Sequence, residues 1–242
     1  MNFTSEDIRD LRDKSGAGMM DCKKALNESN GNIEKALEWL RKKGINTAQK
    51  KSSRSASEGL VTIKINKNIA VIVEVNSETD FVSRNENFQI FCNDLSSTCI
   101  ENKIENIQNL PDSKFFNSKE TVQYNLTDLI SKLGENIVIR RLKYINANGS
   151  FIQKYIHNSI NDDSGKIGVL LIYNVDKQTN EVEEFSKNLC MHIAATEPKS
   201  INIEELDTNL VNKEKSIYLE QLKSSNKPED IINKIVDGKI KK

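Results

Sequence analysis

The stretch Ile69-Ala-Val-Ile-Val-Glu-Val-Asn-Ser-Glu-Thr-Asp-Phe-Val-Ser-Arg84 changes character part-way along. It opens with the apolar run Ile69–Val75, whose β-branched content is typical of a buried strand. It then passes through Ser77, Thr79 and Asp80, short polar residues that satisfy the free N–H groups at a helix start. The stretch therefore predicts a strand that leads directly into a helix.

The predicted helix runs from about Asp80 to Asn102, with Phe81 at or just before its first turn. Its apolar face is made of Phe88, Phe91, Cys92, Leu95 and Cys99. In one continuous helix Phe81 points the same way as Phe88 and Cys99, which would bury it in the core. An aromatic ring beside an acidic residue at such a junction would equally suit an exposed contact with a partner. The periodicity leaves both interpretations open.

Length and composition limit the class of protein. The chain has 242 residues, of which 29% are charged and 37% hydrophobic, as in a soluble globular protein with one large domain or two to three small ones. Lys+Arg and Asp+Glu are both 35, and this balance argues against direct nucleic-acid binding, which needs a basic surface. We find no apolar run near the roughly 20 residues of a membrane span and no signal peptide, so we expect a cytoplasmic protein.

The residues that carry covalent chemistry are few. The chain has four scattered cysteines, Cys22, Cys92, Cys99 and Cys190. Each falls in a predicted helix among apolar neighbours, which is typical of reduced, packed thiols. His192 is expected to be a packing residue, and its position two residues after Cys190 on a helix makes the two side chains point apart. Without a nucleophile elbow, paired metal ligands or a nucleotide loop, we expect no enzyme, no metal and no cofactor.

Residues 1–45 predict a three-helix bundle. Thr4-Ser-Glu-Asp7 forms a capping box, and a second helix runs from Met19 to about Leu26. The third helix begins at Ile33 and is expected to end at Arg41-Lys-Lys-Gly44, since cations and then glycine favour a helix C-terminus. Gly16-Ala-Gly18 lacks the rest of a phosphate loop.

Two methionines begin the second predicted helix. Met19 and Met20 suit a protein-binding groove together with Lys23, although methionine in a small bundle is more often core filling.

Residues 46–58 are polar and basic and predict a linker, either a hinge between domains or an ordered crossing of the surface. Beyond it, two blocks of strands followed by helices predict an α+β core of two subdomains with antiparallel sheets, at 59–140 and 141–200. The expected strands are Leu60–Ile65, Ile69–Asn76, Asn136–Ile145, Phe151–His157 and Ile167–Val175, and the further helices are Ser118–Leu133, ended by Gly134, and Val182–Ala195. Residues 201–242 predict an antiparallel helical hairpin, Ile203–Lys223 with Pro228–Lys239, joined at Ser224–Lys227.

Several motifs resemble those of bacterial elongation factor Ts. Leu11-Arg-Asp-Lys-Ser-Gly-Ala-Gly-Met-Met-Asp-Cys-Lys-Lys-Ala-Leu26 resembles its first signature, and Glu74–Arg84, with Thr-Asp-Phe-Val, resembles its second. Leu133-Gly-Glu-Asn-Ile137 and Met191-His-Ile-Ala-Ala-Thr-Glu-Pro198 are similar to two further elements of the family. The resemblance covers nearly the whole chain. Family members usually continue past the hairpin with a returning strand and a small helix, so either a naturally shorter form or a cropped chain is expected.

The resemblance implies a ubiquitin-associated-like bundle, a two-subdomain core and a coiled-coil protrusion. It implies a guanine nucleotide exchange factor that binds elongation factor Tu in the bacterial cytoplasm and promotes GDP release, with homodimerisation left open. The motif that dislodges Mg²⁺ would be Thr79, Asp80, Phe81 and Val82. The implied partner-binding residues are Arg12, Met19, Met20, Lys23, Asp80, Phe81, Val82, Leu133, Gly134 and His157.

The alternative function is an adaptor that binds ubiquitin-like domains through the bundle, which would leave Thr79-Asp-Phe81 unexplained.

Overall fold

A computed structural model describes residues 3–222 and 228–240. The chain divides into two compact units, Met1–Ala195 and Thr196–Lys242, each described by itself. Within the described residues, no helix combines the length and the apolar character needed to cross a membrane.

The predicted three-helix bundle is confirmed at the N-terminus. It consists of α1 (Ser5–Ser15), α2 (Met19–Glu28) and α3 (Ile33–Lys51). The predicted capping box is present, because the Thr4 N–H donates to Asp7 Oδ2 at 2.6 Å and the Asp7 N–H donates to Thr4 Oγ1 at 3.2 Å. The bundle core is small and consists of Leu11, Cys22, Ala25, Leu26 and Ala36.

The third helix does not end at Gly44, as its basic last turn and glycine predicted, but continues to Lys51. Gly44 is buried inside the helix, where a Cβ atom would lie 3.3 Å from Ser131 of α6 (Val122–Leu133). The glycine therefore serves close helix packing rather than helix termination. The chain that follows α3 is tied to the core, since the carbonyls of Arg54 and Ala56 accept hydrogen bonds from Asn136 and Arg140.

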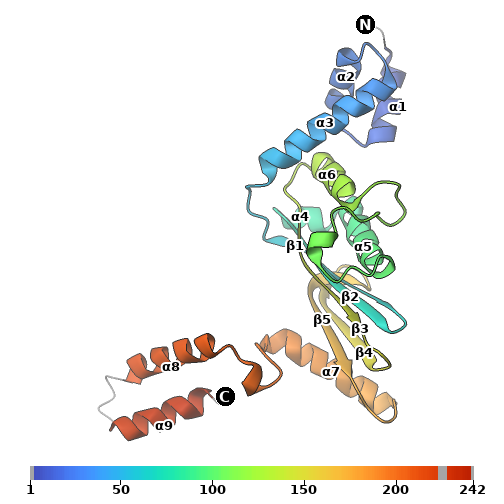
Figure 1. The fold of residues 1–242 in the computed structure, drawn as a ribbon. Coiled ribbons are helices and arrows are strands. Elements are labelled where there is room, and N and C mark those ends of the chain that lie inside the picture. The colour runs from blue at the N-terminus through green and yellow to red at the C-terminus, as the bar shows by residue number, and fades with distance from the viewer. Residues whose placement is uncertain (1–2, 223–227, 241–242) are drawn as a thin grey trace. The chain divides into compact units, whose positions relative to one another are not determined.

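Five strands form one antiparallel sheet in the order β3-β2-β1-β5-β4 (Figure 1). The strands are β1 (Glu58–Asn66), β2 (Ile69–Ser77), β3 (Val138–Asn146), β4 (Phe151–Ser159) and β5 (Ser164–Tyr173). The hairpin β1–β2 is in register from Glu58↔Ser77 to Asn66↔Ile69, whereas the register of β1 with β5 consists of Val61↔Gly165 and Thr62↔Ser164. The predicted antiparallel α+β class is confirmed, and strands of both predicted blocks share this sheet.

The main core lies where α5 (Glu86–Glu101) packs on β1 and β2, with α6 packed against α5 (Figure 1). It joins Val71, Val73 and Val75 of β2 to Phe88 and Leu95 of α5. These alternate positions on β2 all face the helices, as the two-residue period of a strand requires.

The long helix predicted from Asp80 is interrupted. A single turn, α4 (Asp80–Ser83), is followed by Asn85, whose Oδ1 accepts a hydrogen bond from the Asn87 N–H at 2.9 Å and so caps α5. The next helix also starts later than predicted, because Thr121 Oγ1 caps α6 by accepting from the Tyr124 N–H at 3.2 Å. Asparagine and threonine are strong N-caps, and both begin new helices here.

A further helix, α7 (Asn180–Thr196), contacts β4. Its buried residues are Ser186 and Cys190, and Ser186 Oγ bonds Gln153 Oε1 of β4 at 3.3 Å. His192 lies on the exposed side of α7, so its prediction as a packing residue is wrong. The helix turns that residue outward because Ser186 and Cys190 define the opposite, sheet-facing side.

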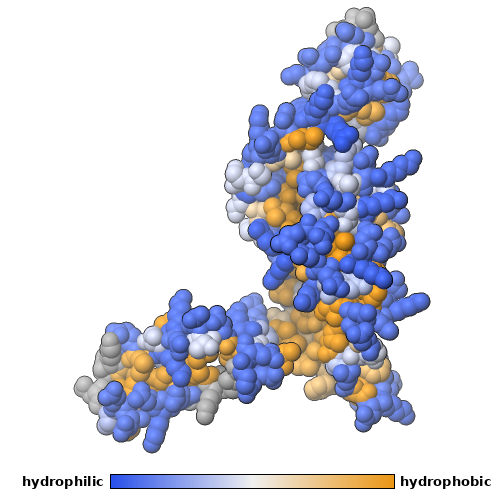
Figure 2. Space-filling model, in the orientation of Figure 1, coloured by the Kyte–Doolittle hydropathy of each residue, from blue (hydrophilic) through white to orange (hydrophobic). Residues whose placement is uncertain are grey.

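The second unit contains two packed helices, as predicted. They are α8 (Thr208–Leu222) and α9 (Glu229–Ile240), preceded by a short 3-10 helix, Ile203–Glu205. Val236 is buried between the helices, and Lys239 Nζ lies 4.6 Å from the centre of the Tyr218 ring. Figure 2 shows apolar side chains gathered on this pair. The predicted connection, Ser224–Lys227, lies outside the described residues.

The close approach at Gly44 is testable by substitution. Gly44→Leu places a branched side chain against Ser131, so we expect the free energy of unfolding in urea to fall by about 1–3 kcal/mol through overpacking. Gly238→Leu in α9 is the matched control, because nothing described lies within 4 Å of a Cβ atom there. Equal effects at the two positions would contradict the packing role of Gly44.

Candidate functional site

The strand-to-helix corner after β2 presents an aromatic ring to solvent. Phe81 is 80% exposed, whereas Val82 beside it is 7% exposed and lies in the main core. The interpretation of Phe81 as a core residue is therefore wrong. It assumed one continuous helix, and the break before Asn85 removes the angular relation between Phe81 and Phe88.

Hydrogen bonds within the corner hold its backbone. Ser77 Oγ donates to the Thr79 carbonyl at 2.9 Å, and Ser83 Oγ donates to the Asp80 carbonyl at 2.6 Å. Arg84 lies 3.8 Å from Asp80, but both side chains are at least half exposed, so this ion pair contributes little. The short polar residues that predicted a helix start thus stabilise the turn that carries Phe81.

The loop between α6 and β3 is hydrogen-bonded to the corner. The Thr79 N–H donates to Glu135 Oε2 at 2.9 Å, and Thr79 Oγ1 donates to Glu135 Oε1 at 2.6 Å. In return, the Asn136 N–H donates to Glu78 Oε1 at 2.6 Å. The structure therefore brings the loop at Gly134, one of the predicted binding segments, directly against the corner that carries Phe81.

The residues of the bundle that were predicted to bind the partner are exposed. Met19 is 49% exposed and Met20 76%, so neither fills the core, and Arg12 and Lys23 are also exposed. The leading interpretation of the methionines as core filling is wrong because Leu11, Cys22, Ala25 and Leu26 occupy the interior of this small bundle.

The bundle also contacts the loop after α6. Lys51 Nζ at the end of α3 donates to the Gly134 carbonyl, and Arg41 stacks over the Tyr124 ring at 4.8 Å. Gly134 ends α6 in the left-handed conformation at φ 72°, as predicted, and Leu133 before it is half-buried. Among the predicted site residues, Leu133 and Gly134 therefore lie between the bundle and the Phe81 corner.

His157 lies apart from these segments. It is exposed on β4, and β1 and β5 separate that strand from β2 in the sheet. Its Nδ1 pairs with Tyr155 Oη at 2.9 Å on the same strand.

Three residues at the corner were not predicted as site residues: Glu78, Glu135 and Asn136. Asn136 is 4% exposed, and its Nδ2 donates to the Arg54 carbonyl at 2.7 Å. The available signal was a Glu-Asn pair directly after a helix-ending glycine. Its partner at Thr79 is 56 residues away in the chain, which no local pattern can indicate.

Comparison with known proteins decides the family. A family model described as elongation factor TS matches residues 78–242, which begins at this corner. The chain is 41% identical to elongation factor Ts of Bartonella bacilliformis over all of this chain and 78% of that protein. It is 40% identical to elongation factor Ts of Rickettsia bellii over the same shares, and 40% identical to that of Rhodospirillum centenum over 97% of this chain and 76% of that protein.

The chain belongs to the elongation factor Ts family. Elongation factor Ts is the nucleotide exchange factor for elongation factor Tu in translation elongation, and it is not an enzyme. This assignment replaces the alternative of an adaptor for ubiquitin-like domains.

The thiols of this chain are buried. All four cysteines are buried and free, and burial raises the pKa of Cys99 to about 12 and that of Cys92 further still. Among the described residues, no group of three or more His, Cys, Asp or Glu side chains is arranged to hold a metal ion. The site therefore presents an aromatic ring and hydrogen-bonding groups rather than a reactive nucleophile.

Burial of the cysteines predicts slow thiol chemistry. Because the thiolate is the reacting species, a raised pKa lowers its fraction at pH 8, and we expect Ellman's reagent to label Cys92 and Cys99 at least about 100-fold more slowly in the folded protein than in the unfolded protein. In guanidinium, the absorbance change of the unfolded chain should correspond to four thiols. Reaction of Cys92 or Cys99 in the folded protein as fast as free glutathione would contradict this burial.

Proposed function

We propose that this chain releases GDP from elongation factor Tu by inserting Phe81 between elements of the partner beside its Mg²⁺ and phosphate site. The observation that carries the proposal is the 80% exposure of Phe81 on a corner whose neighbouring residues are buried or hydrogen-bonded. Thr79, Asp80 and Val82 complete the motif. Thr79 is hydrogen-bonded to Glu135, the Asp80 carbonyl accepts a hydrogen bond within the turn, and Val82 packs in the main core.

The thermodynamics of exchange require a differential contact. A protein that binds the nucleotide-free GTPase more tightly than the GDP-bound form weakens nucleotide binding by the same factor. Contacts to Mg²⁺ and the phosphates dominate the grip of a GTPase on its nucleotide. A wedge placed near those contacts therefore lowers the affinity for GDP most effectively.

An exposed phenylalanine is suited to this task. A fully buried Phe side chain contributes about 1.5–3 kcal/mol relative to an exposed one, so the ring gains this free energy when it enters the partner. Aromatic residues are common among the few that dominate protein interfaces. A corner already ordered in the free protein avoids part of the entropy that binding would otherwise cost.

The remaining predicted residues are proposed to hold the partner while Phe81 acts. Met19, Met20, Lys23 and Arg12 form an exposed surface on the bundle, in which flexible methionine side chains suit an adaptable contact. Leu133 and Gly134 extend the contact beside the corner, and His157 supplies a further contact on β4.

We also propose the finer organisation that the family resemblance implies. The bundle of residues 1–45 is ubiquitin-associated-like, 46–58 links it to the core, and 201–242 is a coiled-coil protrusion. The core divides into 59–140 and 141–200. The separate packing of α5 on β1 and β2 and of α7 on β4 supports this division.

Replacement of Phe81 tests the wedge. Phe81→Ala should slow the factor-stimulated release of a fluorescent GDP analogue by at least about 10-fold, the equivalent of 1.4 kcal/mol. Its unfolding free energy should change by less than about 0.5 kcal/mol because the ring is exposed, whereas a buried Phe would cost about 3–5 kcal/mol. The measurement is stopped-flow fluorescence with elongation factor Tu.

Phe185→Ala is the matched control, because Phe185 is 67% exposed on α7 and lies outside the proposed site. The Phe185→Ala protein should stimulate GDP release from elongation factor Tu at the parent rate. A Phe81→Ala protein that stays within twofold of the parent would remove Phe81 from the mechanism.

The bundle surface predicts a different kinetic signature. Met20→Ala removes a contact that holds the partner but not the wedge, so the half-saturating concentration should rise about 3–10-fold while the maximal rate of GDP release stays unchanged. Met191→Ala is the control, since Met191 is 44% exposed on α7. A lowered maximal rate without a change in half-saturation would contradict a holding role for Met20.

A further inference from the structure

We infer that Glu135 is a positioning residue for exchange, because its carboxylate holds the Thr79 end of the corner and so keeps Phe81 directed outward in the free protein. The inference rests on the proposed function of Phe81. It assigns to the α6–β3 loop a role in orienting the wedge, beyond any contact that the loop itself makes with the partner.

The turn that carries Phe81 cannot orient itself. α4 has four residues, and a single helical turn is unstable in isolation because its nucleation is unfavourable. The Thr79 hydroxyl donates to Glu135 rather than capping this turn. The Phe81 ring is 80% exposed, so packing against its own domain does little to fix it. Its direction must therefore be set by the backbone and by neighbouring residues.

Glu135 supplies that restraint at the residue where the chain leaves the sheet. One carboxylate oxygen accepts from the Thr79 N–H at 2.9 Å and the other from Thr79 Oγ1 at 2.6 Å. Hydrogen bonds to an ionised acceptor are roughly twice as strong as neutral ones. Two bonds from one carboxylate to one residue also restrict rotation of the backbone two positions before Phe81.

A reciprocal bond closes the arrangement. Glu78, next to Thr79, accepts from the Asn136 N–H at 2.6 Å, so adjacent residues of the corner and of the loop exchange carboxylate bonds. Arg54 lies 3.6 Å from Glu78, and the Arg54 carbonyl in turn accepts from Asn136 Nδ2 at 2.7 Å. These bonds join the corner, the loop and the segment after α3, and Glu78 and Asn136 among them are half-buried or buried.

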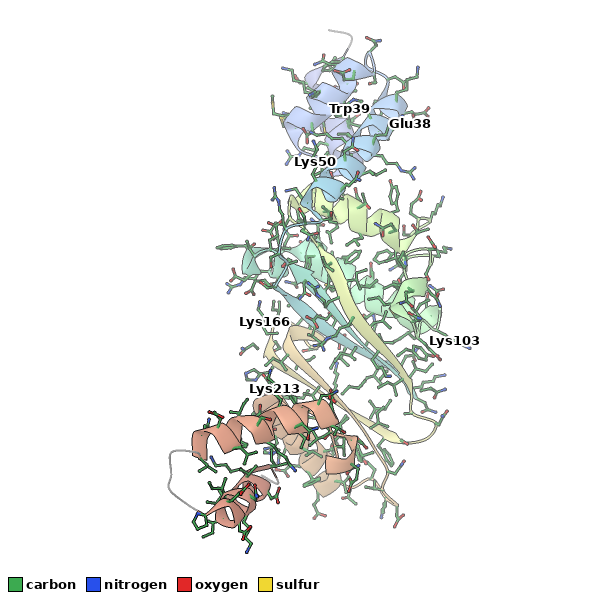
Figure 3. All side chains as sticks on the ribbon, turned by 60° about the vertical axis from the view of Figure 1, so that its left-hand side comes forward. Glu38, Trp39, Lys50, Lys103, Lys166 and Lys213 are labelled. Carbon is green, nitrogen blue, oxygen red and sulfur yellow. The ribbon has the colours of Figure 1, made fainter. Side chains whose placement is uncertain are left out.

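The loop itself stands on a rigid support. Gly134 ends α6, and its N–H donates to the Ile130 carbonyl at 2.9 Å. The Gly134 carbonyl accepts a hydrogen bond from Lys51 at the end of α3; the neighbouring residue Lys50 is labelled in Figure 3. α6 packs closely on α3 at Gly44. A binding group held by well-packed neighbours in this way keeps the geometry that its action needs.

The experiment separates positioning from holding. Glu135→Gln keeps the shape of the side chain but leaves one acceptor oxygen for two donors, so we expect the maximal rate of stimulated GDP release to fall about 3–10-fold, with the half-saturating concentration within twofold of the parent. Thr79→Val removes the hydroxyl that donates to Glu135, so its maximal rate should fall as well. Glu101→Gln, a charge removal at the exposed far end of α5, is the control and should be unaffected.

A second measurement does not involve the partner. Amide hydrogen exchange of Thr79 and Asn136 in the free protein should be at least 10-fold faster in Glu135→Gln than in the parent, and unchanged in Phe81→Ala. A parent-like maximal rate in Glu135→Gln or in Thr79→Val would overturn the positioning role. A parent-like rate in Phe81→Ala would instead overturn the proposed function. Failure of the proposed function and failure of the positioning role are therefore detected with different variants.

Discussion

The exchange of carboxylate hydrogen bonds between Glu78-Thr79 and Glu135-Asn136 is the constraint on which the site depends. It joins the end of β2 to the start of β3 and places the Phe81 corner beside the loop that ends α6. Hydrogen bonds to carboxylates are strong where water is partly excluded, and these residues are half-buried or buried. Without this exchange, the direction of the exposed ring would depend on the hydrogen bonds within the corner and on the packing of Val82.

The core beneath the corner explains why the ring can be exposed at all. Val82 points into the same core as Val75 and Phe88, so the corner is stabilised by its other apolar residue. Phe81 is consequently free to remain in solvent without loss of the fold. Together with membership of the elongation factor Ts family, this division of roles indicates a protein that acts by binding energy, through contacts that differ between the nucleotide-bound and nucleotide-free partner.

Local patterns in the sequence predicted much of the fold. The strand leading to Thr79, the capping box at Thr4 and the helix end at Gly134 all appear as expected, because each depends on a few neighbouring residues. The signatures around Met19 and Phe81 were sufficient to indicate the family. Errors arose where a local signal had two meanings: Gly44 matched a helix end but serves close packing with α6.

The sequence by itself determined most of the strands and helices, the cap at Thr4, the helix end at Gly134 and the family, since alternation and capping act over a few residues. Only the tertiary structure decided that Phe81 faces solvent, because a helix break at Asn85 and not the helical period sets its direction. Only the tertiary structure brought Glu135 to Thr79, a contact between residues 56 positions apart. Such pairings follow from how strands and helices pack, which short-range patterns do not encode.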